Sequence, residues 1–196
     1  MQVVLATHNQ HKVQELRRIL APRLPGLEVL AYDGPEPVED GVTFAENALI
    51  KARTAAAHTG LPAIADDSGI CVDVLGGSPG IFSARWAGPA RDSDQNLNLL
   101  LWQLGDVSAE HRGGHFTCVA ALALPDGTEW HVTGEWPGQI LTEPSGAGGF
   151  GYDPIFLPDG YAISAAELTP NVKNEHSHRA RAFGKLIPVL ETLLEA

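Results

Sequence analysis

The chain has 196 residues and a formal net charge of −11, from 24 acidic residues against 13 lysines and arginines. This length predicts a single domain, residues 1–196, with a sizeable buried core. The acidic balance argues against sequence-independent binding of nucleic acid polymers, which needs a broad basic surface. No apolar stretch reaches the roughly 20 residues of a membrane-spanning helix, and the first residues lack the pattern of a signal peptide. Cys71 and Cys118 lie in apolar runs, which predicts buried, unpaired thiols in a cytoplasmic protein.

The first third of the chain alternates strand and helix signals. Residues 2–6 and 27–31 are rich in β-forming residues and predict strands. Apolar residues at helical spacing predict a helix over residues 10–21; they are Val13, Leu16 and Leu20. Thr43 and Glu46 have the spacing of a capping box, which predicts a helix that ends at Gly60.

The central part predicts strands joined by glycine-rich loops. Residues 62–65 and 70–75 predict two strands, with a turn over Asp-Asp-Ser-Gly at 66–69 between them. Residues 115–124 and 129–135 predict a β-hairpin around Pro-Asp-Gly-Thr. The other assignments here are a helix over 94–104 and glycine-rich loops at 76–88 and 146–153.

The C-terminal segment predicts one long helix capped by Ser177 and kinked by Pro188. Its inward stripe should consist of Phe183, Ile187, Leu190 and Leu194. Helices that alternate with strands, together with one hairpin, predict an α/β protein with a mixed central β-sheet flanked by helices.

Residues 7–12, Thr-His-Asn-Gln-His-Lys, stand between the first predicted strand and helix. A helix N-terminus offers free N–H groups and a positive dipole end, which favour phosphate, and Lys12 adds an ammonium in the first turn. The alternative interpretation makes Asn9 a helix cap and Lys12 a solvated lysine.

Glu39 and the adjacent Asp66 and Asp67 are candidate acidic groups. Mg²⁺ binds to one or two carboxylates and completes its shell with water and substrate phosphates, so Glu39 and Asp67 could hold it. In the predicted turn the two aspartates diverge, and one could cap backbone amides; the alternative is a plain Asx-turn. Lys51 lies one turn after Asn47 on the capped helix, so both can face one side.

Two further stretches have the composition of ligand-binding segments. Residues 148–154 place glycines beside Phe150, which suits a flat ligand on which the ring stacks, and Asp153 could accept from ring N–H groups. The alternative is a tight turn with Phe150 in the core. Lys173, His178 and Arg179 offer cations for phosphate or for a base carbonyl, or else only a basic first helical turn.

Taken together, these stretches resemble the inosine triphosphate pyrophosphatase family, hydrolases of non-canonical purine nucleoside triphosphates. The resemblance covers essentially the whole chain and rests on separated motifs in the family's order. They are VLATHNQHK, FAENALIKA, AIADDSGICVDVLGGSPGIFSARWAG, GGFGYDPIF and SHR. Three positions depart from the family, which usually has glycine where this chain has His8, His11 and Ala180.

The resemblance implies two lobes with a nucleotide cleft between them, a homodimer, and Mg²⁺-dependent hydrolysis of ITP, dITP and XTP to the monophosphate and pyrophosphate. It assigns Asp67 as proton acceptor and metal ligand, with Glu39 as the second metal carboxylate. The implied phosphate contacts are Thr7, His8, Asn9, Gln10, His11, Lys12 and Lys51. The implied remaining substrate and base contacts are Ser68, Phe150, Gly151, Tyr152, Asp153, Lys173, His178 and Arg179.

Two alternative functions are considered. A Maf-like nucleotide pyrophosphatase would prefer other bases, and a panel of substrates separates the two. A non-enzymatic nucleotide sensor would bind without turnover, but the Glu39 and Asp67 pair argues against it, since a sensor need not keep a hydrolytic metal site.

Overall fold

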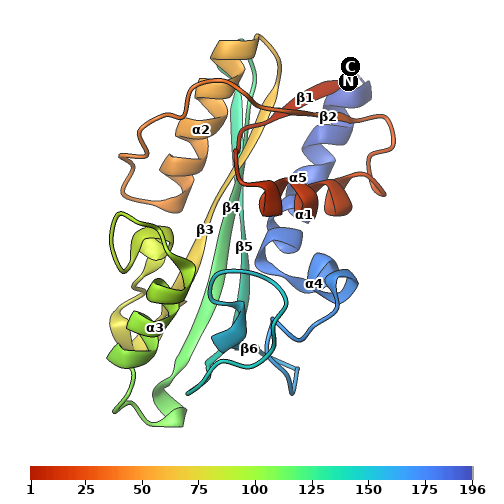
Figure 1. The fold of residues 1–196 in the computed structure, drawn as a ribbon. Coiled ribbons are helices and arrows are strands. Elements are labelled where there is room, and N and C mark those ends of the chain that lie inside the picture. The colour runs from red at the N-terminus through yellow and green to blue at the C-terminus, as the bar shows by residue number, and fades with distance from the viewer. Residues whose placement is uncertain (196) are drawn as a thin grey trace. The chain divides into compact units, whose positions relative to one another are not determined.

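The computed structural model describes residues 1–195, apart from the side chains of Gln10, His11 and Glu195. Six strands form one mixed sheet in the order β2-β1-β3-β4-β5-β6 (Figure 1). The strands are β1 (Gln2–Leu5), β2 (Glu28–Ala31), β3 (Ala63–Val72), β4 (Gly113–Ala123), β5 (Glu129–Ile140) and β6 (Phe156–Pro158). The α-helices are α1 (Gln10–Leu20), α2 (Phe44–Thr59), α3 (Ser93–Gln103), α4 (Pro170–His176) and α5 (His178–Glu195). The predicted α/β class with a mixed central sheet is confirmed.

The chain divides into two compact units. Unit 1 comprises Met1–Asp67, Cys118–Gly134 and Ser177–Ala196, and unit 2 comprises Ser68–Thr117 and Glu135–His176. Each unit has a hydrophobic core of its own.

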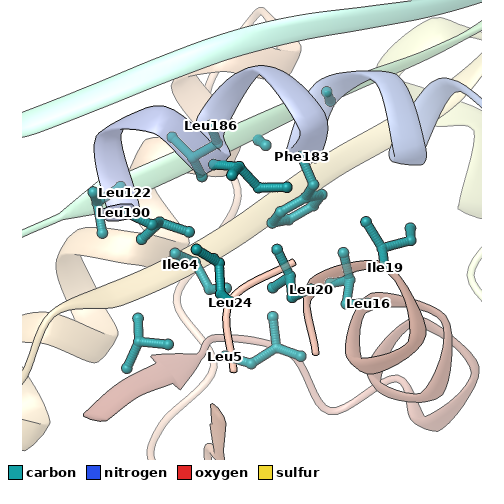
Figure 2. Packing of buried hydrophobic residues seen from close by; sticks show 14 of the residues in the cluster. Leu5, Leu16, Ile19, Leu20, Leu24, Ile64, Leu122, Phe183, Leu186 and Leu190 are labelled. Atoms are coloured by element: carbon teal, nitrogen blue, oxygen red, sulfur yellow. The ribbon is translucent and has the colours of Figure 1, made fainter. Parts of the chain in front are cut away.

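Unit 1 is built on parallel pairing of β1 with both β2 and β3. Alternate strand residues point to opposite faces, so each face receives its own helices. On one face, α1 and α5 pack on Leu5 and Ile64, as Figure 2 shows. On the other face, the alanines of α2 pack closely on Val4 and Ala63. The result is a helix–sheet–helix sandwich whose three layers meet at β1 and β3.

The helix ends of unit 1 follow the capping signals in the sequence. Thr43 Oγ1 accepts from Glu46 N at 3.2 Å, and Glu46 Oε2 accepts from Thr43 N at 3.0 Å, so the predicted capping box is confirmed. Gly60 ends α2 with φ 68°. Ser177 Oγ accepts from Ala180 N at 3.2 Å, which confirms Ser177 as the cap of α5. The helix continues past Pro188.

The core of unit 2 gathers around aromatic residues of its strands. Phe116 and Trp136 both contact Phe156 edge-on, and α3 covers this cluster with Leu97 and Leu100. The buried Arg112 joins three segments, because its guanidinium donates to the carbonyls of Leu104, Ile140 and Leu141 at 2.6, 2.8 and 2.7 Å.

Several predicted boundaries are wrong. Residues 66–69 form no turn but lie inside β3, because tertiary pairing within the sheet overrides the turn preference of Asp-Asp-Ser-Gly. The predicted loop at 76–88 contains a short 3₁₀ helix, Gly80–Arg85, and α4 was not predicted.

Other predictions from the sequence hold. The hairpin is confirmed by adjacent β4 and β5, with Leu124 N donating to Thr128 O at 2.8 Å. Both cysteines are buried free thiols. Among the described residues, we find no helix with the length and apolar character needed to cross a bilayer.

We expect Arg112→Met to lower the free energy of unfolding by about 2–3 kcal/mol, because two buried carbonyls and a partly buried one lose a charged donor. The measurement is urea denaturation followed by tryptophan fluorescence. Arg53→Met is the matched control, since Arg53 forms an exposed ion pair with Glu129 and should cost less than about 1 kcal/mol. An equal decrease in the free energy of unfolding of the two variants would contradict the conclusion that the hydrogen bonds of Arg112 stabilise unit 2.

Candidate functional site

Asp66 and Asp67 are neighbours in β3, and the alternation of the strand directs their side chains to opposite faces of the sheet. Asp66 lies on the face covered by α1 and α5, as Ile64 does, and Asp67 lies on the α2 face, as Ala65 does. Ile64 pairs with Leu5, the last residue of β1, so both carboxylates lie just beyond the carboxyl end of β1. Ligands of open α/β sheets bind at such strand ends.

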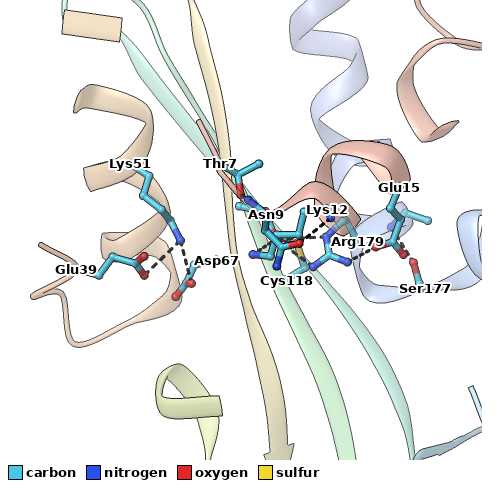
Figure 3. Close-up of polar contacts among 12 residues, drawn as sticks. Thr7, Asn9, Lys12, Glu15, Glu39, Lys51, Asp67, Cys118, Ser177 and Arg179 are labelled. Carbon is cyan, nitrogen blue, oxygen red and sulfur yellow. Dashed lines mark hydrogen bonds and ion pairs between the residues drawn. The ribbon is translucent and has the colours of Figure 1, made fainter. Parts of the chain in front are cut away.

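On the α2 face, Lys51 joins two carboxylates (Figure 3). Its Nζ lies 3.1 Å from Asp67 Oδ1 and 3.3 Å from Glu39 Oε2. The side chains of Lys51 and Asp67 are only 13% and 12% exposed. Asp67 Oδ2 is buried and accepts no hydrogen bond from the residues that the structure describes. This group, Glu39, Lys51 and Asp67, is called the Lys51 cluster below.

The start of α2 positions Glu39. Asn47 Oδ1 accepts from Gly41 N at 3.0 Å, and Glu46 Oε2 accepts from Val42 N at 2.6 Å. A Cβ at Gly41 would lie 2.7 Å from Asn47 Oδ1, so the close approach requires glycine. The helix start therefore holds the segment that carries Glu39 near Lys51, one turn further along α2.

Burial and neighbouring charges shift the ionisation of this cluster. Burial lowers the pKa of Lys51, but Asp67, Asp66 and Glu39 raise it, so its pKa lies above the ordinary value. Burial raises the pKa of Asp67 and outweighs the opposing effects of Lys51 and Lys12. A buried carboxylate with an unused oxygen favours a further cation.

On the opposite face, Asp66 is the centre of a buried ion-pair network. Lys12 Nζ lies 3.0 Å from Asp66 Oδ2, and Arg179 donates to the same oxygen through Nη2 at 3.2 Å and Nε at 3.3 Å. Arg179 Nη1 also pairs with Glu15. Burial would raise the pKa of Asp66, but Lys12 and Arg179 hold it well below its usual range. Cys118 lies at the edge of this network, and burial raises its pKa.

The prediction that one of the two aspartates caps backbone amides of a turn is wrong for Asp66. Asp66 is a residue of β3, and Lys12 and Arg179 balance the charge of its buried carboxylate. Glu15 was missed from the sequence. The available signal was its position three residues after Lys12, which places the two side chains on one side of α1.

Residues 7–12 contain a capped helix start. Asn9 Oδ1 accepts from Lys12 N at 3.2 Å, and Thr7 Oγ1 accepts from Asn9 N at 3.1 Å, so Asn9 is a helix cap. Lys12 is not a solvated lysine, since its side chain is 16% exposed and pairs with Asp66. His8 stacks on Tyr32 with ring centroids 5.7 Å apart. The side chains of Gln10 and His11 lie outside the described residues.

Unit 2 contains the predicted base-binding stretch. Asp153 Oδ2 accepts from Lys173 Nζ at 2.5 Å and from Phe150 N at 2.7 Å. Lys173 Nζ also lies 5.0 Å from the Phe150 ring centroid. A Cβ at Gly149 would approach Asp153 Oδ2 to 2.2 Å, which explains the glycine there. The structure thus groups Lys173 with Phe150 and Asp153.

The remaining predicted residues have varied surroundings. Tyr152 is buried, and its hydroxyl donates to Ser83 O at 2.8 Å, so its side chain packs in the core of unit 2. Gly151 has φ 63°, a conformation that suits glycine. Ser68 is a partly buried residue of β3 in unit 2, whereas His178 is buried at the start of α5 in unit 1.

The donor chemistry of the Lys51 cluster fits Mg²⁺. No group of three or more His, Cys, Asp or Glu suited to a metal occurs among the described residues. Two carboxylates with one unused buried oxygen suit an ion that takes its other ligands from water and phosphates.

Comparison with known proteins identifies the family. The model of the Ham1 family matches residues 3–189. A dITP/XTP pyrophosphatase of Leifsonia xyli subsp. xyli is 58% identical over 98% of this chain and 97% of its own length. Its counterpart in Streptomyces coelicolor is 55% identical over 98% of both chains.

Solved structures of Ham1 and dITP/XTP pyrophosphatase proteins have a similar fold. A HAM1 protein from Coxiella burnetii is 39% identical with a TM-score of 0.89, over 98% of this chain and 99% of its own. A nucleoside-triphosphatase / dITP/XTP pyrophosphatase from Mycobacterium abscessus is 46% identical with a TM-score of 0.77, over 96% of this chain and 100% of its own. Because the family model matches nearly its whole length and solved Ham1 proteins share its fold, this chain belongs to the Ham1 family.

Proposed function

We propose that this protein hydrolyses non-canonical purine nucleoside triphosphates, ITP, dITP and XTP, to the monophosphate and pyrophosphate. Relatives named dITP/XTP pyrophosphatase match nearly the whole chain. The observation in the structure that carries the proposal is Asp67, a buried carboxylate with an unused oxygen beside Lys51 and Glu39. Residues 1–196 are proposed to act as one catalytic domain.

The phosphates are proposed to bind in unit 1. Lys51 and Lys12 carry the positive charge, and the N-terminus of α1 adds its dipole. Glu39 and Asp67 would hold Mg²⁺, which when bound polarises the phosphate and lowers the pKa of water. Asp67 Oδ2 can accept a proton from the attacking water, because it has no hydrogen bond to lose within the described protein. Transition-state charge is stabilised mainly by these cations.

The base is proposed to bind to residues of unit 2. The Phe150 ring offers a stacking face, and Asp153 is held by Lys173 and by the Phe150 amide. Hypoxanthine and xanthine have a carbonyl at the 6-position, whereas adenine has an amino group. One N–H of the Lys173 ammonium donates to Asp153, and another can donate to such a carbonyl. Against adenine this second N–H would lack a partner, which is costly for a buried donor. His178 and Arg179, the donors expected from the sequence, stay proposed substrate contacts.

We further propose a cytoplasmic homodimer. The dimer follows from the family resemblance, and the two buried free thiols suit a reducing compartment. Size-exclusion chromatography with light scattering should give twice the chain mass of 20.8 kDa. A monomer at micromolar concentration would contradict the dimer.

The activity itself is tested by pyrophosphate release across a panel of nucleoside triphosphates, with and without Mg²⁺. We expect ITP, dITP and XTP to exceed ATP and the pyrimidine triphosphates. A preference for pyrimidine substrates would indicate the Maf-like alternative.

Asp67→Asn should reduce kcat below a tenth of the wild-type value, while nucleotide affinity measured without Mg²⁺ stays within about tenfold. The substitution keeps the shape but removes a metal charge and the proton acceptor. Steady-state kinetics and calorimetric binding check both parts. Asp126→Asn, in an exposed turn, is the control and should leave kcat unchanged. An Asp67→Asn enzyme with more than a tenth of wild-type kcat would remove Asp67 from catalysis.

Lys173→Met should lower kcat/KM for ITP at least about tenfold, or 1.4 kcal/mol, and also narrow the ITP:ATP preference. The reason is the loss of the buried donor beside Phe150 and Asp153. The measurement is kcat/KM for ITP, GTP and ATP in both enzymes. A uniform loss with an unchanged ITP:ATP ratio would instead make Lys173 a phosphate contact.

A further inference from the structure

The ammonium of Lys51 occupies the carboxylate pair that a divalent cation would use. It lies within 3.3 Å of Glu39 Oε2 and 3.1 Å of Asp67 Oδ1. With its side chain only 13% exposed, the ammonium is largely removed from water, so its attraction to both carboxylates is only weakly screened. Lys51 therefore neutralises negative charge that a divalent cation on these carboxylates would otherwise neutralise.

A divalent cation on the same carboxylates would meet this ammonium at close range. The three side chains together carry one net negative charge when Lys51 is protonated, and a divalent ion changes that to one net positive charge. Two cations a few ångströms apart in a half-buried site repel strongly. Binding of the metal thus requires that Lys51 leave or that a further anion enter.

The Lys51 side chain is able to move its ammonium away from the two carboxylates. A lysine ammonium is a point charge on a flexible four-carbon stem, and it needs no fixed planar geometry in its partner. The backbone that carries the two carboxylates is held by contacts that do not involve Lys51. Glu39 belongs to the segment held by the capping box of α2, and Asp67 is a residue of β3. The polyphosphate of a nucleotide offers the anion to which the ammonium can move.

We propose that Lys51 is a positioning residue that competes with the metal for Glu39 and Asp67 and passes to the substrate phosphates when nucleotide binds. The consequence is positive coupling: the metal binds weakly alone and tightly with nucleotide, and by linkage the nucleotide gains the same factor from the metal. Such coupling limits occupation of the site by a metal in the absence of substrate. The competition rests on the Lys51 cluster alone, and the transfer to phosphate rests on the proposed function.

The first experiment measures Mg²⁺ binding by calorimetry without nucleotide. Lys51→Met should bind Mg²⁺ at least tenfold more tightly than the wild type, whereas a residue with a merely structural role would weaken the site. Lys185→Met is the matched control, since it removes one positive charge from unit 1, while its Nζ donates to the Thr133 carbonyl and, within the described part of the chain, pairs with no carboxylate. It should bind Mg²⁺ within twofold of the wild type. Unchanged or weaker binding by Lys51→Met overturns the proposal.

Two further variants locate the effect and guard against misfolding. Glu39→Gln added to Lys51→Met should remove the gained affinity; if the gain survives, the metal binds elsewhere and the proposal is wrong. Lys51→Gln keeps hydrogen-bond donors to the carboxylates but removes the charge, so it replaces Lys51→Met if circular dichroism shows that variant unfolded. It should give the same tighter binding of Mg²⁺.

The second experiment repeats the titration with saturating α,β-methylene-ITP, which cannot be cleaved at the α,β bond. The analogue should raise the Mg²⁺ affinity of the wild type at least tenfold and that of Lys51→Met clearly less. If the analogue raises the Mg²⁺ affinity of both proteins equally, the proposal that Lys51 moves to the substrate phosphates is wrong. If the wild type does not bind the analogue, the proposed function fails, while the Mg²⁺ titration alone still decides the competition.

Discussion

The stability of unit 1 depends on the ion pairs that the buried Asp66 carboxylate forms with Lys12 and Arg179. A charge inside a sheet sandwich is costly unless cations and hydrogen bonds replace the lost water, and removal of one partner of such a pair strongly destabilises a protein. Lys12 from α1 and Arg179 from α5 supply that compensation, and Glu15 balances the second guanidinium nitrogen. The Asp66 side chain of β3 therefore connects α1 and α5 through ion pairs.

The same strand carries Asp67, the proposed proton acceptor, and its pleat directs the two aspartates to different surroundings. Asp66 points to the face of α1 and α5, where its Oδ2 pairs with Lys12 and Arg179. Asp67 points to the face of α2, where one oxygen is bound by Lys51 and the other is unused. A shift of β3 by one residue would exchange these surroundings, because strand side chains alternate. The network around Asp66 thus favours the strand register in which Asp67 faces Lys51.

Local helix signals serve the site as well as the fold. The capping box at Thr43 and Glu46 starts α2, and the adjoining Asn47 and Gly41 hold the segment that brings Glu39 to Lys51. In unit 2, Gly149 allows Asp153 to approach the backbone and to meet Lys173. In both places a glycine permits a close polar contact that any side chain would obstruct.

Much of the secondary structure, the fold class and the family of this protein can be predicted from its sequence. Short-range signals determine the capped helices, the hairpin and the mixed α/β class, because caps, turns and apolar periodicity act within a few residues. The separated motifs around Lys12, Asp67, Phe150 and Arg179 also point to one family. The partners of these residues were not predictable in the same way: Glu15 with Arg179, Asp66 with Lys12, and Asp153 with Lys173 are contacts that only the packed structure decides. The turn expected at residues 66–69 failed for the same reason, since pairing with neighbouring strands and burial of charge depend on chain segments far away in the sequence.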